Sequence, residues 1–490
     1  MSEQTTNSSK VIKGMSSQTL VTIVLGVVDV VSFSIMSRLL TQEDFGYYAA
    51  ITAITMVFAS FSETGIGSAL IQRKEIDQRF INNAFTLSLI FGLFLSLLLF
   101  CVAGPISVMV LDSTLKTPLR LMSITLLCHC LISVNISLMQ RELKFLRVGL
   151  IHLISLVVTT IVAIVLAVKG FGYYAILAKA ILSSLLTLVL SYALLKMRFG
   201  FNLDKKTFKS IFGFSGWLMA SVFFRNFAQQ ADRLLMGKLL SVSSLGAYNR
   251  PKEFINQVAN KVGGIFDSAL FPVLSSVQDQ EKSIINAYEK SLYYMCLFGS
   301  FLSLLMFFNS NLIIRIFFGT EWLTVSTTFR ILSIVILFWF LSRLADCFLR
   351  SLALTKKQFF FRIIETLINL VGVVVGSLYD INGIAIALLI GSLLILAMKN
   401  IFISRKIKYP IAATIKCVFS SCRFCIVFVP IMMVLDFIMP HTVIGDVANV
   451  IVFCVLSLIL FMGFPGFIGD KYKSEIYTYV VSVVKKQIRK

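Results

Sequence analysis

The feature that most constrains this chain is a succession of apolar runs, each long enough to cross a membrane as a helix of about 20 residues. Hydrophobic residues make up 57% of the 490 positions and charged residues only 14%, whereas soluble domains are about 45–50% apolar and about 25% charged. The sequence therefore predicts an all-α polytopic membrane protein with about 14 transmembrane helices. The predicted spans are 16–37, 46–67, 82–109, 119–139, 147–168, 172–195, 211–237, 252–275, 287–309, 324–349, 360–379, 381–403, 413–436 and 445–466. The loops between them are too short to hold a soluble catalytic domain.

The distribution of basic residues predicts the orientation of the chain. Lys and Arg number 45 against 24 Asp and Glu, a net charge of +21. With the N-terminus in the cytoplasm, thirty basic residues fall in cytoplasmic segments, among them Arg350, Arg362 and Lys399, and nine fall outside. Because cytoplasmic loops carry an excess of Lys and Arg, this asymmetry predicts an even number of helices with both termini inside. The excess positive charge is thus an orientation signal, and nucleic-acid binding is not needed to explain it.

An internal repeat divides the chain. Arg38-Leu-Leu-Thr-Gln-Glu-Asp-Phe-Gly-Tyr-Tyr48 is matched 200 positions later by Lys238-Leu-Leu-Ser-Val-Ser-Ser-Leu-Gly-Ala-Tyr248, and both follow an odd-numbered span. A weaker echo pairs Gly170–Ile176 with Asp380–Ile386. Repeated halves with a substrate site between them are typical of secondary transporters. We expect a six-helix half at 1–200, a second at 201–409, and two additional helices with a basic tail at 410–490.

At these residues the chain resembles Wzx-type polysaccharide flippases, and among them members similar to colanic-acid exporters. These flippases form the polysaccharide branch of the multidrug/oligosaccharidyl-lipid/polysaccharide exporter superfamily. The resemblance covers roughly residues 10–410. It lies in Arg38–Tyr47, Phe61–Lys74, Asp232–Gly237, Leu245–Arg250, Leu270–Ser275, Phe318–Trp322 and Asn382–Ala387. It implies translocation of undecaprenyl-pyrophosphate-linked oligosaccharide repeat units across the bacterial inner membrane, for O-antigen, capsule or exopolysaccharide synthesis. It also implies alternating access and a possible coupling to H⁺ or Na⁺.

Six basic and six acidic residues remain for the spans once those assigned to the loops are set aside. Each costs about 2.5–3.5 kcal/mol if it faces lipid at the helix centre, so these residues should face a cavity, pair, or lie near a helix end. They are Lys179, Arg225, Arg233, Lys261, Arg343, Arg423, Asp29, Glu63, Asp232, Asp267, Asp346 and Glu365. Polar residues also recur at helical spacing through 225–236 and 253–267, which suggests a water-filled cavity between the halves.

Two interpretations of these intramembrane charges stay open. Arg225, Arg233, Lys261 and Arg343 are candidates to bind the pyrophosphate or acidic sugars, because a guanidinium donates two hydrogen bonds to one phosphate. Alternatively they are structural, with Arg343 paired to Asp346, and Arg233 paired to Asp232 or Asp267. The acids Asp29, Asp232, Asp267 and Asp346 are candidates for ion coupling or for lining the cavity.

Other chemistry finds little support. Cys128-His129-Cys130 and Cys422-x-x-Cys425 have no second ligand pair at zinc spacing, so no metal site is expected. The sequence contains no P-loop or nucleophile elbow, and we expect no catalytic residue and no cofactor. A cation-coupled drug or metabolite exporter of the same superfamily is the alternative function, and an intramembrane enzyme a third. The expected partners are the lipid-linked oligosaccharide and membrane lipids, with the polysaccharide polymerase and chain-length machinery as further candidates and the protein itself a monomer.

Overall fold

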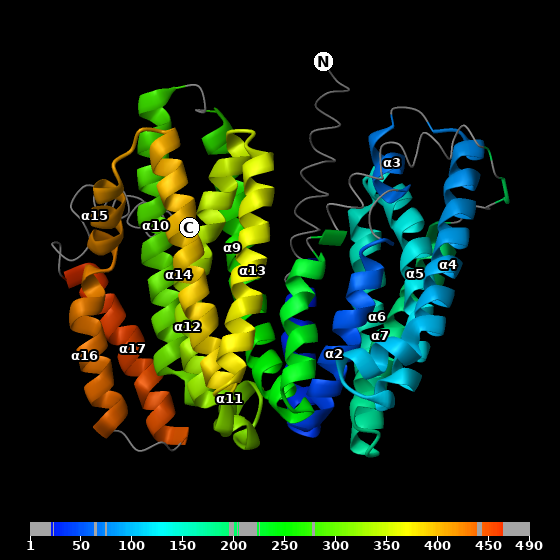
Figure 1. Ribbon diagram of the computed structural model, residues 1–490, viewed down its shortest axis with the longest axis horizontal. Coiled ribbons are helices and arrows are strands. Elements are labelled where there is room, and N and C mark those ends of the chain that lie inside the picture. The colour runs from blue at the N-terminus through cyan, green and yellow to red at the C-terminus, as the bar shows by residue number, and fades with distance from the viewer. Residues whose placement is uncertain are drawn as a thin grey trace, which may run out of the picture. The chain divides into compact units, whose positions relative to one another are not determined.

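The chain folds into two compact units, Met1–Asn249 and Arg250–Lys490, in a computed structural model (Figure 1). The structure describes residues 21–463 apart from 23, 63–65, 74–75, 196–199, 203, 205–222, 225, 277–279 and 439–442. The described part is helical throughout and contains no strand. Eight of its helices are long and apolar enough to span a membrane. The predicted all-α polytopic fold class is thereby confirmed.

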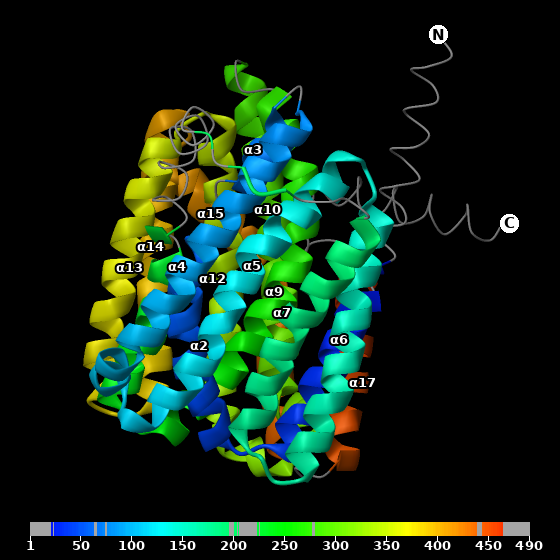
Figure 2. The ribbon, with the colours of Figure 1, turned by 90° about the vertical axis from the view of Figure 1, so that its right-hand side faces the viewer.

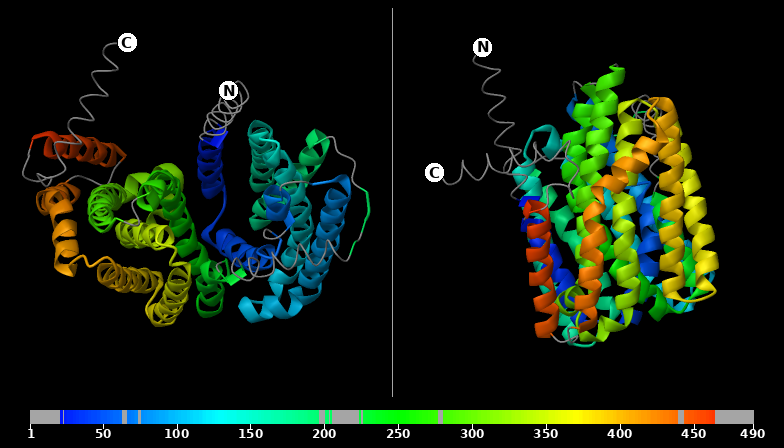
Figure 3. Two further views of the ribbon diagram at one scale, coloured as in Figure 1. Left: turned by 90° about the horizontal axis from the view of Figure 1, so that it is seen from above. Right: turned by 90° about the vertical axis from the view of Figure 1, so that its left-hand side faces the viewer.

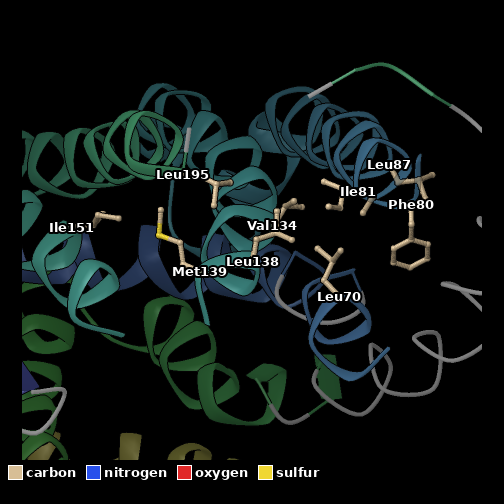
Figure 4. Close-up of a cluster of buried hydrophobic side chains, with 10 residues drawn as sticks. Leu70, Phe80, Ile81, Leu87, Val134, Leu138, Met139, Ile151 and Leu195 are labelled. Atoms are coloured by element: carbon tan, nitrogen blue, oxygen red, sulfur yellow. The ribbon is translucent and has the colours of Figure 1, made fainter. Parts of the chain in front are cut away.

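The first unit is built on long helices that run side by side (Figure 2). Its elements are a helix over residues 24–39, α2 (Gln42–Ala59), α3 (Ile66–Gln72), α4 (Gln78–Val110), η1 (Ser113–Leu115), α5 (Lys116–Arg141), α6 (Phe145–Val168), α7 (Tyr173–Leu195) and a helix over residues 226–239. Helix α5 packs on α4 and α7, and α6 on α7. Leu70, Phe80, Val134 and Leu138 belong to the apolar core between α3, α4 and α5 (Figure 4).

The second predicted span, 46–67, is not one helix. Helix α2 ends at Ala59, the chain turns at residues 60–62, and a separate short helix α3 begins at Ile66. The Arg141 side chain, at the end of α5, donates to the carbonyl oxygens of Leu70 (2.8 Å) and Arg73. A guanidinium thus caps the C-terminal end of α3, where helix carbonyls otherwise lack partners.

The second unit has its own bundle, in which α12 packs on α10 and α14, and α13 on α14. Its elements are α9 (Val242–Ser276), which crosses the boundary between the units, α10 (Glu281–Phe308), α11 (Ser310–Phe317), η2 (Thr320–Val325), α12 (Ser326–Ser351), α13 (Thr355–Ser377), α14 (Ile381–Lys406), α15 (Ile411–Ser421), α16 (Arg423–Ile438) and α17 (Val443–Gly463). Helix α9 begins ten residues before the predicted start at 252.

The last two predicted spans form the edge of the second unit, coloured orange and red in Figure 3. The predicted span 413–436 is divided at Cys422 into α15 and α16, and α16 packs on α17. Phe308 of α10, Phe428 and Met432 of α16, and Phe453 of α17 form a buried apolar cluster. This cluster joins the additional helices to the bundle.

The sequence repeat has a structural counterpart in two loops. Leu143, after α5, and Ala353, after α12, both adopt positive φ, 57° and 55°, and lie 210 positions apart. In each loop the residue that follows directly donates its backbone N–H to a carbonyl five residues back: Lys144 to Met139 (2.9 Å) and Leu354 to Leu349 (2.8 Å). This is the Schellman ending of a helix, in which glycine is the usual residue at the left-handed position. The same spacing of 210 separates the paired motifs at Gly170 and Asp380.

Candidate functional site

Two arginines of α12 converge on one carboxylate of α9 in the second unit. Arg343 Nη2 lies 2.9 Å from Asp267 Oδ2, and Arg350 Nη2 lies 3.5 Å from the same oxygen. The two arginines are seven residues apart, which places them on one face of the helix. Because two guanidinium groups share one carboxylate, this group of three carries a net positive charge.

The surroundings of Arg343 hold its side chain in place. Its Nη1 donates to Asn260 Oδ1 at 3.3 Å, and its Cζ lies 4.8 Å from the centre of the Trp339 ring, a cation–π contact. Gly263 makes room, because a Cβ there would lie 2.9 Å from the Trp339 ring and 3.0 Å from Arg343 Nε. Arg343 Nε and Asp267 Oδ1 are buried, and neither has a hydrogen-bond partner among the described residues. Polar atoms of this kind are available to a ligand or to water.

A second charge cluster lies between α12, α13 and α14. Lys399 of α14, with a side chain only 2% exposed, has its Nζ 2.9 Å from Asp346 Oδ1 and 3.6 Å from Glu365 Oε2. It also donates to Ser342 Oγ at 2.8 Å. Arg362 Nη2 approaches Asp346 Oδ2 at 3.5 Å. Two acids and two bases balance here, so this cluster is neutral.

The structural alternative that paired Arg343 with Asp346 differs from the contacts observed. The two residues are three positions apart on α12 and point to different neighbours: Arg343 toward Asp267 of α9, and Asp346 toward Lys399 and Arg362. The assignment of Arg362 and Lys399 to cytoplasmic loops is also corrected, because both lie within helices. The overlooked signal was that both lie inside predicted spans, Arg362 in 360–379 and Lys399 in 381–403.

The remaining candidate residues are dispersed over both units. Asp29 is half-buried in the first helix, and Lys261 is an exposed residue of α9. Asp232 Oδ1 accepts from the backbone N–H of Arg233 at 2.9 Å, and Arg233 Nη1 donates to Gln230 Oε1 at 3.2 Å. Arg225 lies outside the described residues. Of the eight candidates, Arg343 and Asp267 are brought into direct contact.

In the first unit, polar side chains form hydrogen bonds between neighbouring helices. Lys179 of α7 donates to Ser32 Oγ in the first helix, and Thr160 of α6 donates to the same oxygen at 3.2 Å. Thr187 donates to Ser155 Oγ at 3.0 Å. These hydroxyls satisfy polar groups that would otherwise be costly within a membrane. Among the described residues, no three His, Cys, Asp or Glu side chains are placed to hold a metal ion.

The comparisons with known sequences identify a family. The family model described as "Polysaccharide biosynthesis protein" matches residues 35–327. The succinoglycan biosynthesis transport protein ExoT of Rhizobium meliloti is 26% identical over 255 residues, and the chain spans about half (51%) of its length and aligns over 51% of its own. The lipopolysaccharide biosynthesis protein WzxC of Escherichia coli is 23% identical over 396 residues, 80% of each chain. The teichuronic acid biosynthesis protein TuaB of Bacillus subtilis is 22% identical, over 67% of this chain and 68% of that protein.

Solved structures show the fold. The inward closed conformation of the lipid II flippase MurJ superimposes with a TM-score of 0.67 at 17% identity, over 91% of this chain and 98% of that chain. An inward-facing multidrug resistance MATE family transporter superimposes with a TM-score of 0.62 at 13% identity, over 78% and 94% of the two chains. The helical architecture is thus that of flippases and exporters. With the family model matching more than half of its length, the chain belongs to the polysaccharide biosynthesis protein family.

Proposed function

We propose that the protein is a flippase that carries undecaprenyl-pyrophosphate-linked oligosaccharide repeat units across the bacterial inner membrane by alternating access. The product would be a surface polysaccharide: O-antigen, capsule or exopolysaccharide. The family match and the names of the relatives, a succinoglycan transport protein and a lipopolysaccharide biosynthesis protein, support the substrate class. The observation that carries the proposal is the net positive charge of Arg343 and Arg350 around Asp267.

The chemistry of the cargo explains why such a charge is needed. A pyrophosphate cannot cross hydrocarbon without partners, because the desolvation of an unpaired anion is prohibitive. An arginine fork that is already held by a carboxylate and an aromatic ring needs little reorganisation when a phosphate oxygen replaces water beside it. The fold alone is shared with a multidrug transporter, so the family match, together with this cationic group, favours an anionic glycolipid over a cationic drug.

Deletion of the gene tests the proposed function. We expect surface polysaccharide to be lost and lipid-linked repeat units to accumulate on the cytoplasmic face. Re-expression of the wild-type chain should restore export. Unchanged surface polysaccharide in the deletion strain would overturn the proposal, and so would a loss of polysaccharide without accumulation of the lipid-linked unit.

Substitution of Arg343 tests the binding group. Arg343→Ala removes a charge-assisted hydrogen bond of about 1.5–3 kcal/mol, so export should fall about tenfold or more. Arg343→Lys should recover part of the export, because the charge stays while the two-pronged geometry is lost. Lys357→Ala, at an exposed cation of α13, is the matched control and should export normally. Full export by a folded Arg343→Ala protein would assign this arginine to structure.

The remaining candidate residues are proposed to take part in anion binding and in ion coupling. We expect Arg225, Arg233 and Lys261 to assist in anion binding, and an H⁺ or Na⁺ gradient to drive the cycle in a monomer that hands its product to the polymerase. Asp29 and Asp232 are the acids that we propose to test for ion coupling, because ionisable residues inside membrane spans are commonly functional. Transport into proteoliposomes under an imposed pH or Na⁺ gradient should be gradient-dependent for the wild type. It should lose that dependence in Asp29→Asn or Asp232→Asn.

A further inference from the structure

The two copies of the repeated motif begin two helices in the same way. Helix α2 starts at Gln42 and α9 at Val242, 200 positions apart. Each is preceded by a hydroxyl residue whose oxygen accepts a backbone N–H three residues on: Thr41 from Asp44, and Ser241 from Ser244, both at 3.2 Å. Hydroxyl residues at this position satisfy N–H groups that the helix itself leaves without partners.

These two helix starts cross in direct backbone contact, inside the first unit. A Cβ placed on Gly46 would lie 1.9 Å from the carbonyl oxygen of Val242, and a Cβ on Gly246 would lie 1.8 Å from that of Gln42. The second contact is the first with each residue replaced by its counterpart 200 positions away: Gly246 replaces Gly46, and Gln42 replaces Val242. Two surfaces in which i meets j and j meets i are related by a twofold axis. The repeat is therefore also a local symmetry of the fold.

Only glycine fits at either position. Their nearest neighbours are backbone atoms and the β-branched side chain of Val242, and none of these is the flexible end of a long side chain. The hydrogen that replaces Cβ on each glycine points toward the facing carbonyl oxygen, the geometry of a weak C–H···O contact. Contacts of this kind give close approach at little energy, so they can form and separate repeatedly.

The α2 side of the crossing is firmly anchored. Asp44 Oδ2 accepts from the Thr41 N–H at 3.0 Å, and its Oδ1 accepts from the N–H of Tyr173, at the start of α7, at 2.8 Å. The Tyr47 and Tyr173 rings lie 4.9 Å apart. Gly172 adopts φ +54°, and a Cβ there would lie 2.6 Å from Asp44 Oδ1. The start of α2 thus belongs to a fixed corner of the first unit.

The α9 side leads out of the first unit. The boundary between the units falls between Asn249 and Arg250, three residues after Gly246, and α9 continues unbroken across it to Ser276. Any tilt of α9 with the second unit therefore acts on the Gly246 contact. The positive-inside rule places both helix starts on the outer side of the membrane.

We propose that the crossing of Gly46 and Gly246 is the outer gate of the transporter. While the two helix starts touch, the pathway is shut on that side, and release of the cargo requires them to part. The inference rests on the alternating-access part of the proposed function and not on the identity of the cargo. A side chain at either glycine holds the two helix starts apart and leaves the gate open.

The test measures access from outside. In the full-length chain with all nine native cysteines replaced, Gly264→Cys serves as reporter, because nothing lies within 4 Å of a Cβ at that position. We expect a membrane-impermeant thiol reagent to label it several-fold faster in Gly46→Ala and in Gly246→Ala than in the glycine parent. Gly104→Ala, whose Cβ would meet only Lys116 at 3.8–4.0 Å, should label like the parent. Equal labelling of folded Gly46→Ala, Gly246→Ala and Gly104→Ala proteins would overturn the gate.

A second measurement keeps the native glycines. Gln42→Cys and Val242→Cys place one thiol on each helix start, and a short bifunctional thiosulfonate joins them from outside. The reporter cysteine would also react with the linker, so any labelling of the reporter should be measured before the link is made. Export should stop in the linked protein and resume when the link is reduced. Continued export by the linked protein would overturn the gate. If the glycine variants label as expected but the deletion strain keeps its surface polysaccharide, the cargo assignment is overturned and the gate stands.

Discussion

At the residue scale, Lys399 shows how an intramembrane charge is tolerated. Its ammonium is enclosed by Asp346, Glu365 and the Ser342 hydroxyl, and its side chain is almost fully buried. Removal of one partner from such a group leaves the others as uncompensated buried charges, which typically costs 3–5 kcal/mol. These neighbours therefore offset the free energy of burying the lysine, and the four charged side chains of this cluster act as one unit.

Lys399→Met should accordingly destabilise the protein by about 3–5 kcal/mol, seen as a lower melting temperature in detergent. Asp346→Asn with Lys399→Met should lose less than the sum of the two single variants, because the residues share partners. Lys357→Met, at an exposed position of α13, is the control and should melt like the wild type. An additive double variant would contradict the shared cluster.

Arg141 shows how a charged side chain can stabilise the end of a helix. Its guanidinium donates to the carbonyls of Leu70 and Arg73 at the end of α3. Composition identified Arg141 only as an orientation signal, since the role depends on contact between segments some 70 positions apart. Loop cations in such a chain can thus have two roles, and only the fold distinguishes them.

At the scale of elements, the loops after α5 and α12 share a helix ending with positive φ at Leu143 and Ala353. A non-glycine residue in this conformation costs about 1–2 kcal/mol. Ala353→Gly should relieve that strain and raise stability by up to about 1 kcal/mol, whereas Ala353→Val should lower it because a β-branched residue fits this region poorly. Thermal unfolding followed by circular dichroism measures both. A lower melting temperature for the glycine variant would contradict the strain.

Helix positions were largely predictable from hydropathy, and helix interruptions were not. The spans around α4 to α7 and α10 to α14 coincide with predicted runs. The break at residues 60–62 lies beside Ser60, Ser62 and Glu63, and the break at Cys422 lies beside Ser421 and Arg423. Hydropathy averaged over a run of about 20 residues does not resolve such short polar groups. The early start of α9 was missed because its first ten residues mix apolar residues with Ser243, Ser244, Asn249 and Arg250, and so form no apolar run.

At the scale of the whole molecule, the repeat could be read from the sequence and the family from the motifs, while the orientation of the chain stays a prediction. The partners of the site could not be read from the sequence. One alternative from the sequence paired Arg343 with Asp346 on its own helix, whereas the structure pairs it with Asp267 of α9. Helical spacing gives the face of a residue, but the neighbour that meets that face follows from packing between helices distant in sequence.

The attachment of the two additional helices is testable at this scale. Arg315 Nε of α11 lies 3.0 Å from Asp446 Oδ2 of α17, and Asp446 is 4% exposed. Asp446→Ala should loosen α16 and α17, because it leaves Arg315 without that carboxylate in an otherwise apolar contact. Hydrogen exchange within 423–463 should rise several-fold, with the rest of the second unit unchanged. Uniform exchange across the unit would show that the pair supports the whole bundle.

The twofold contact of Gly46 and Gly246 also bears on the ancestry of the chain. Residues that meet their own counterparts about an axis are those by which two identical polypeptides assemble. A chain of half this length could bind a copy of itself through the same glycine and the same carbonyl. Fusion of two such genes would then free each copy to diverge. The two glycines would be retained from the dimer, whereas the intramembrane charges that now differ between the halves would have arisen after it.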